Sequence, residues 1–311
     1  MQLKNTAAVF WDSPNGSGHQ LSTPNYQLLF LAEITAANVG KLREMTGVGM
    51  MECKKALVEA QGDMDKAVDN LRKSGAASAA KKSLRDAREG VIAQHITPGG
   101  KSGVLVEVNC ETDFVARNES FRAFCDDITK KVAANPAVDL EADRQAAVAK
   151  IGENIKITRN ARLEVSGNGL VAAYIHTGAK VGVLVEVGAG KAETVGRDEF
   201  KQLVKDITLQ IAAGHPHAVS REQVSPEVVA KEREIAAQSD RLKGKPAQAM
   251  EKILAGVLDK FFQTYCLVDQ GFVKRNSEIS VKDHVAEVGK LLGDEITIRS
   301  FVRFQVGEAA A

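Results

Sequence analysis

The chain lacks an excess of charge of either sign, and this absence narrows the classes of function. Its 311 residues carry 41 Lys and Arg against 40 Asp and Glu, which gives a formal net charge of +1. Proteins that bind nucleic acid through the phosphates usually carry a clear basic excess or a basic stripe, and the sequence has neither. We therefore expect no nucleic-acid partner.

Cysteine is scarce, and the four that are present follow no ligand pattern. No two are spaced as in a C-x-x-C pair, and none has a partner at the spacing of a zinc site. This predicts reduced, mostly buried thiols in a cytoplasmic protein that holds no metal or other cofactor. The cysteines are Cys53, Cys110, Cys125 and Cys266.

Long apolar runs and phosphate-binding loops are missing as well. No stretch approaches the roughly 20 apolar residues that a membrane-spanning helix needs, so we expect no membrane partner. The chain has no G-x-x-x-x-G-K-[ST] loop, because residues 188–191, Gly-Ala-Gly-Lys, lack the first glycine at the right spacing and the following Ser or Thr. We expect no small-molecule substrate of the protein's own.

Residues 1–31 have no helical or strand periodicity. They contain a turn-rich run from Asp12 to Gly18, and Lys4 is their only basic residue before His19. This composition fits neither a secretory signal nor an Arg-rich transit peptide. We expect residues 1–31 to be a disordered tail or an over-extended start, and residues 308–311 to be a second tail.

Residues 32–75 are predicted to form a module of three short helices. Thr35 can cap the first helix and Asp63 the third, while residues 47–49, Gly-Val-Gly, separate the first from the second. Gly75 is predicted to end the third helix, and residues 76–89 to be a linker that is partly helical. The expected inward-facing residues are Val39, Leu42, Met45, Met50, Cys53, Leu57, Val58, Ala67, Val68 and Leu71.

An internal repeat organises the rest of the chain. Residues 90–96, Gly-Val-Ile-Ala-Gln-His-Ile, resemble residues 169–175, and the run Gly-Val-Leu-Val-Glu-Val at 103–108 recurs at 182–187. Both pairs are 79 positions apart. Each unit reads as a β-hairpin followed by an amphipathic helix. Residues 155–165 and 296–306, which are 141 positions apart, are predicted to supply a third strand to each unit.

The offset between the units grows by 62 residues, from 79 to 141, and the extra length is helical in composition. Residues 226–240 and 246–264 flank a turn at 242–246, which predicts an inserted antiparallel helical hairpin. Residues 281–292 are predicted to form one more helix. The sequence thus predicts an α+β fold: the helical module, two repeated α/β core subdomains with antiparallel sheets at 90–167 and at 168–225 plus 265–307, and the hairpin at 226–264.

The two units differ most after their second strand. Residues 109–118 read Asn-Cys-Glu-Thr-Asp-Phe-Val-Ala-Arg-Asn, whereas residues 188–194 are small and polar. In one interpretation Phe114 is a core residue and Asp113 or Asn118 a helix cap. In the other, Phe114 protrudes and becomes buried in a partner, which is worth about 1.5–3 kcal/mol. An adjacent carboxylate would then compete for the contacts of a phosphate site.

Most of the chain, from Ala32 to about Gly307, resembles bacterial elongation factor Ts. The resemblance is carried by residues 42–57, Leu-Arg-Glu-Met-Thr-Gly-Val-Gly-Met-Met-Glu-Cys-Lys-Lys-Ala-Leu, and by residues 107–117, Glu-Val-Asn-Cys-Glu-Thr-Asp-Phe-Val-Ala-Arg. Residues 244–246, Gly-Lys-Pro, and 251–253, Glu-Lys-Ile, add to it. The resemblance implies a translation elongation factor that is not an enzyme, and that binds the GDP form of elongation factor Tu and promotes GDP release for exchange to GTP.

The resemblance also implies which residues contact this GTPase. The helical module is similar to a ubiquitin-associated fold and rests on the GTPase domain, while the Asp113–Phe114 loop inserts near the magnesium and phosphate site. His176 matches a second contact with the same domain, although its place near a hairpin also fits a simple turn residue. The implied partner-binding residues are Gly47, Val48, Gly49, Met50, Thr112, Asp113, Phe114, Val115 and His176.

Two other classes of function use parts of the same sequence. An enzyme would recruit Cys110, Asp113 and His95 as a nucleophilic site, but no base with an orienting partner is visible and His95 falls in mid-strand. An adaptor would use residues 35–75 as a ubiquitin-type binding module, which leaves the difference between the two units unexplained. Release of GDP from purified elongation factor Tu distinguishes the three.

Removal of residues 1–31 is expected to leave the protein unchanged. They have no periodicity and lie outside the resemblance, so a chain that begins at Ala32 should match the full chain in melting temperature and in GDP release. Thermal unfolding and release of a fluorescent GDP measure the two properties. A large loss of either one contradicts the prediction.

Overall fold

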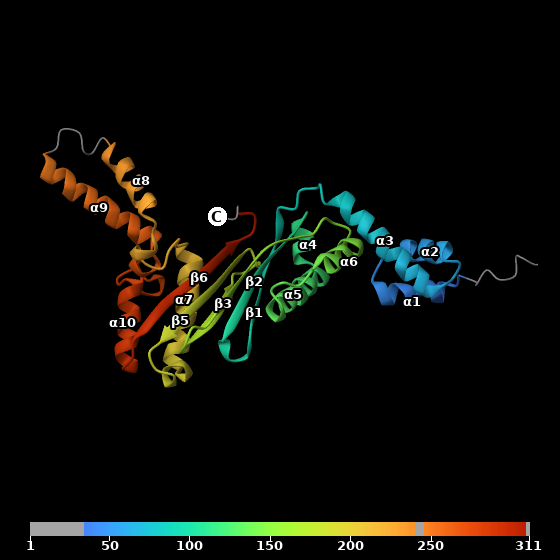
Figure 1. Cartoon of the computed structure of the whole chain (residues 1–311), viewed down its shortest axis with the longest axis horizontal. Coiled ribbons are helices and arrows are strands. Elements are labelled where there is room, and N and C mark those ends of the chain that lie inside the picture. Colours follow the sequence, from blue (N-terminus) through green and yellow to red (C-terminus); the bar gives the residue numbers. More distant parts are fainter. Residues whose placement is uncertain (1–33, 240–245, 309–311) are drawn as a thin grey trace, which may run out of the picture.

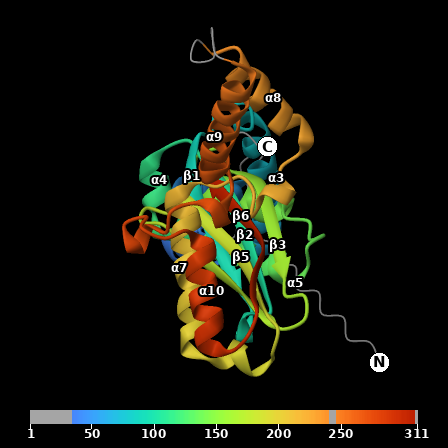
Figure 2. The same ribbon diagram turned by 90° about the vertical axis from the view of Figure 1, so that its left-hand side faces the viewer.

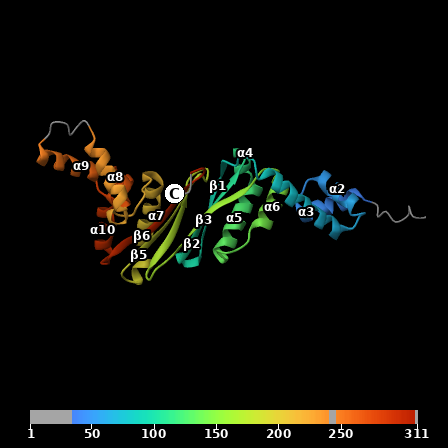
Figure 3. The same ribbon diagram turned by 45° about the horizontal axis from the view of Figure 1, so that its top comes forward.

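The structure is elongated, with helices at both ends and two β-sheets between them (Figures 1 and 3). This computed structural model describes residues 34–239 and 246–308, so the predicted tail at 1–31 lies outside it. The combination of helices with antiparallel sheets confirms the α+β class. Among the helices in these ranges, none is both long enough and apolar enough to cross a membrane.

The N-terminal module consists of helices α1 (Ala36–Thr46), α2 (Met50–Glu59) and the first part of α3 (Met64–Lys82). Thr35 and Asp63 cap α1 and α3 as predicted, since their side chains accept the N–H groups of Asn38 and Lys66. Three residues expected to face inward are exposed instead, because so small a module has too little interior to cover every apolar side chain. They are Met45, Met50 and Val58.

Gly75 does not end the third helix, so this prediction is wrong, and residues 76–82 of the predicted linker are helical. Gly75 is buried, and a Cβ placed there would lie 3.3 Å from the Cβ of Ala149 in helix α6 (Glu141–Ile151). The missing side chain therefore lets two helices approach each other. The alanines that follow favour the helix, and Ala79 reaches the core of the first sheet. Helix α3 thus extends from the module to the core of the first sheet, and residues 83–88 connect it to β1.

The two sheets have the same strand order and are antiparallel throughout. Both predicted hairpins and both predicted third strands are present. In each sheet the register shifts once on the central strand, directly after a glutamate, Glu107 in one and Glu186 in the other. The strands are β1 (Glu89–Ile96), β2 (Ser102–Cys110) and β3 (Lys156–Glu164), then β4 (Gly169–Ile175), β5 (Val181–Ala189) and β6 (Ile296–Gln305).

The sheets pack face to face, and helices cover their outer faces. Helices α5 (Glu119–Ala134) and α6 cover the first sheet, and α7 (Asp198–Gly214) and α10 (Val281–Leu292) cover the second (Figures 1 and 2). Ile92 and Leu105 of the first sheet meet Val171 and Leu184 of the second. Both faces of β2 and β5 are therefore buried, which explains why the run at 103–108 is almost continuously apolar.

Helix α6 is not predicted from the sequence, although α10 is. The offset of 141 positions maps residues 141–151 onto residues 282–292, so the two helices hold corresponding positions. Each ends at a glycine in the left-handed region, Gly152 with φ +90° and Gly293 with φ +62°. These two glycines are 141 positions apart, and this match is the sequence signal that would have revealed α6.

Helices α8 (Pro226–Ala237) and α9 (Ala247–Tyr265) pack together and project from the second sheet (Figure 1). Only their base joins an apolar cluster, which is centred on buried Cys266. The part of the predicted turn at 242–245 lies outside the described residues. The helical side chains in the cluster are Val228, Val229, Phe261, Phe262 and Tyr265.

Removal of the outer part of this hairpin is expected to leave both sheets folded. Among the described residues, replacement of 231–257 by a short Gly-Ser linker removes none of the side chains that form the apolar clusters. Hydrogen exchange of residues 90–214 should therefore keep its protection. Loss of protection in these residues contradicts the prediction that the hairpin is an appendage.

Candidate partner-binding site

The Thr112–Val115 loop lies where β2 ends and the short helix α4 (Asp113–Arg117) begins. Thr112 caps α4, because its Oγ1 accepts the N–H of Val115 at 3.3 Å. Asn118 caps the next helix, α5, by accepting the N–H of Ser120 at 2.8 Å. The interpretation of Asn118 as a cap is therefore confirmed, and that of Asp113 is wrong.

Phe114 is exposed, which excludes the core interpretation. Its side chain is 81% exposed, whereas Ala116, two residues later on α4, is 3% exposed and packs into the core of the first sheet. The turn of helix thus holds Phe114 in solvent on a short, capped element. An exposed Phe forgoes about 1.5–3 kcal/mol that burial would contribute, and this free energy is available to a partner.

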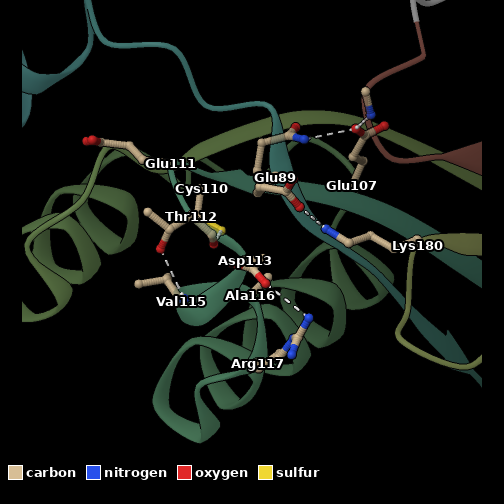
Figure 4. A network of polar contacts seen from close by, with 12 residues as sticks. Glu89, Glu107, Cys110, Glu111, Thr112, Asp113, Val115, Ala116, Arg117 and Lys180 are labelled. Atoms are coloured by element: carbon tan, nitrogen blue, oxygen red, sulfur yellow. Dashed lines mark hydrogen bonds and ion pairs between the residues drawn. The ribbon is translucent and has the colours of Figure 1, made fainter.

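Asp113 is restrained by an ion pair within α4 (Figure 4). Its carboxylate lies 3.0 Å from Nη2 of Arg117, one helical turn away. Arg117 is exposed and Asp113 is about half exposed, and solvent-exposed pairs at this spacing contribute only about 0.3–0.5 kcal/mol. The carboxylate of Asp113 therefore has a preferred direction in the free protein and remains free to change partners.

The base of the loop is held by a carboxylate that the sequence analysis did not single out. Glu153, between α6 and β3, accepts the N–H groups of Glu111 and Thr112 at 3.0 Å each and the hydroxyl of Thr112 at 2.6 Å. In return, the carboxylate of Glu111 accepts the N–H of Asn154 at 2.6 Å. The end of β2 and the start of β3 thus hold each other across the loop.

The residues of the alternative nucleophilic site are not brought together. Burial raises the pKa of the Cys110 thiol to about 12, so the sulfur stays protonated and donates to the carbonyl of Thr112. His95 pairs with Val104, whereas Cys110 pairs with Glu89, which is six residues or about 20 Å away along β1. Within residues 34–239 and 246–308, no group of three or more His, Cys, Asp and Glu side chains is placed to hold a metal ion.

His176 lies in the turn between β4 and β5, and this turn packs against the first sheet. The imidazole is exposed, with Nδ1 3.0 Å from the hydroxyl of Tyr174. From the same turn, the carbonyl of Ala179 accepts the N–H of Ile92, and Lys180 pairs with Glu89 at the start of β1 (Figure 4). Strand β1 also contacts α4, so both sheets contribute to this part of the surface.

Residues 47–50 lie on the helical module and not beside the Thr112–Val115 loop. Gly47 ends α1 with φ +67°, Gly49 precedes α2, and Met50 is half exposed. Val48 is buried inside the module. Helix α6 lies between the module and α4 (Figures 1 and 3). The predicted contact residues of the module are therefore separate from those of the Thr112–Val115 loop.

Replacement of Phe114 by alanine is expected to leave thermal stability nearly unchanged, because the side chain has almost no contacts to lose. The matched control is Phe121→Ala on α5, which removes a fully buried ring and should cost about 3–5 kcal/mol. Differential scanning calorimetry of both variants measures the difference. Similar losses of stability in the two variants would return Phe114 to the core.

Comparison with known proteins places the chain in one family. Residues 111–308 match the family model described as "Elongation factor TS". The elongation factor Ts of Symbiobacterium thermophilum is 46% identical over 285 residues, which cover 89% of this chain and 93% of that protein. The protein of the same name from Chloroherpeton thalassium is 45% identical over 295 residues, which cover 89% of this chain and 100% of the relative. The chain therefore belongs to the elongation factor Ts family.

Proposed function

We propose that the protein binds the GDP form of elongation factor Tu and promotes the release of GDP, so that GTP takes its place. The Asp113–Phe114 loop would insert near the magnesium and phosphate site of this GTPase. The observation that carries the proposal is the exposure of Phe114, at 81%, on a capped helix whose base donates three hydrogen bonds to the carboxylate of Glu153. The family assignment supports the choice of partner.

Thermodynamic linkage relates the affinity of such a factor for the GTPase to the affinity of GDP. If binding of the factor weakens the binding of GDP, then GDP weakens the binding of the factor by the same ratio. The factor must therefore bind the nucleotide-free partner best. It requires no bond-making chemistry, which agrees with a protonated Cys110 that pairs with Glu89 and lies six residues along β1 from His95. We therefore propose that the protein is not an enzyme.

An aromatic ring and a carboxylate next to each other suit this task. A Phe side chain can fill a gap between helices of the partner with little loss of conformational entropy. The carboxylate of Asp113 can compete for the donors or the cation that hold the phosphates, and the bound cation carries much of the charge at such a site. The weak pair with Arg117 keeps Asp113 available for this exchange of partners.

Further surfaces are available to hold the partner while the loop acts. The helical module, which we propose to be ubiquitin-associated-like, exposes Met45, Met50 and Met51 around the ends of α1 and α2. Methionine surfaces adapt well to a second protein. The His176 turn offers another contact. Because these surfaces are spread along an elongated molecule, affinity need not depend on Phe114 alone (Figure 1). We propose that the protein works in the cytoplasm and without nucleic acid.

Replacement of Phe114 by alanine should slow the release of GDP from elongation factor Tu roughly ten- to a hundredfold, the equivalent of about 1.5–3 kcal/mol of lost burial. Asp113→Ala should act in the same direction. The double variant should be less than additive, because adjacent residues of one loop share a task. Stopped-flow release of fluorescent GDP, over a range of factor concentrations, separates the maximal rate from affinity.

The control for this experiment is Glu193→Ala. Glu193 corresponds to Phe114 in the second repeat and is exposed in the 3₁₀ turn Glu193–Gly196, so its removal should leave the release rate unchanged. A Phe114→Ala protein that releases GDP at the full rate would refute the insertion mechanism. A native protein that does not accelerate release at all would refute the function.

A further inference from the structure

We propose that Glu153 is the positioning residue of the Asp113–Phe114 loop, and that the protein uses this carboxylate to fix the direction in which Phe114 points. The proposal rests on the proposed function. Glu153 itself does not touch the partner. It acts through Thr112, the residue directly before Asp113 and Phe114. It therefore affects the rate of GDP release more than the affinity for elongation factor Tu.

The contacts of Glu153 are concentrated on the hinge of the loop. Its Oε2 accepts the N–H groups of Glu111 and Thr112, both at 3.0 Å, and its Oε1 accepts the hydroxyl of Thr112 at 2.6 Å. Because three donors from Glu111 and Thr112 bind one carboxylate, the backbone of these two residues is held in a single orientation. The same Thr112 oxygen accepts the N–H of Val115, so the carboxylate is connected to both sides of Phe114.

The position of Glu153 is itself held from outside the loop. The next residue, Asn154, is buried, and its N–H donates to Glu111 at 2.6 Å. The side-chain amide of Asn154 donates to the carbonyl of Arg85 at 2.8 Å, in the segment that leads from α3 to β1. Glu153 therefore connects a buried part of the fold to the loop that carries the exposed Phe114. This preorganises the ring for a rigid insertion.

The second repeat contains the same anchor without the exposed ring. Asp294 lies 141 positions after Glu153 and accepts the N–H of Lys191 at 2.9 Å and the hydroxyl of Thr194 at 2.6 Å. The turn that it holds presents Glu193 in place of Phe114. An acid at this position therefore stabilises a strand-to-helix turn in both repeats, and only in the first does the turn carry a large apolar side chain. Asp294 is thus a matched internal control.

The test compares Glu153→Ala with Asp294→Ala in the full chain. Glu153→Ala should lower the maximal rate of GDP release from elongation factor Tu roughly tenfold, because a hydrogen-bonded charge no longer holds the loop. The factor concentration at half-maximal rate should change little. The Asp294→Ala variant should promote GDP release at the native rate, although its melting temperature should fall about as much as that of Glu153→Ala. Equal slowing by both variants would overturn the proposal, since it would point to general destabilisation.

Three further variants separate positioning from a structural role. Glu153→Gln should keep most of the rate, since its amide oxygen can accept both N–H groups while its NH₂ donates to the Thr112 hydroxyl. Thr112→Val, which leaves Glu153 unchanged, removes both the hydroxyl contact with Glu153 and the cap on the N–H of Val115, and it should slow release measurably. In the Phe114→Ala background, Glu153→Ala should cause no further slowing, because the ring that it positions is gone.

The outcomes distinguish this inference from the proposed function. Full slowing by Glu153→Ala in the Phe114→Ala background, or a native rate in Thr112→Val, overturns the positioning role and leaves the role of Phe114 intact. A native rate in Phe114→Ala overturns both. A tenfold slowing that depends on the presence of Phe114 supports both.

Discussion

The central strands β2 and β5 are buried on both faces, and the rest of the molecule is arranged around that constraint. One face of each strand packs against the other sheet, and the opposite face lies under helices. Close approach of the sheets requires glycine, since a Cβ on Gly103 would lie 2.8 Å from Cδ1 of Leu184. Neither sheet could bury both faces alone, so each half of the core depends on the other.

Two buried glutamates on these strands tie the halves together. Glu107 accepts from Arg159 of its own sheet and from the N–H of Gly307, which follows the last strand of the other sheet. Glu186 likewise accepts from Arg299 of its own sheet and from an N–H of the segment that follows β3. A buried carboxylate is stable only with such partners. The segments that follow β3 and β6 therefore each donate to a buried glutamate of the opposite sheet and help to hold the two sheets together.

This arrangement explains how one surface combines a rigid base with an exposed tip. The turn between β4 and β5 lies against β1, and the loop after β2 is held by Glu153 from the segment before β3. Strand β2 is buried, and Glu153 holds the residues that follow it. The ring of Phe114 can therefore remain in solvent on a rigid support. In the second repeat an equivalent anchor carries only a polar side chain.

Local rules were enough to predict much of the fold. The repeat located both hairpins and both third strands, and the local pattern predicted the helix at 281–292, because alternation and capping depend on neighbours in the chain. The same rules failed at Gly75, where burial against α6 outweighs the tendency of glycine to end a helix. They also placed Met45 and Met50 inside a module too small to cover them.

The sequence by itself determined the α+β class, the position of the insertion and the place where the two repeats differ, since each of these is written in the order of the residues. Only the tertiary structure decided that Phe114 is exposed and that Glu153 holds the loop from 41 positions away. Exposure and long-range hydrogen bonds depend on which segments meet in space. That meeting follows from the packing of two whole sheets, and no local pattern contains it.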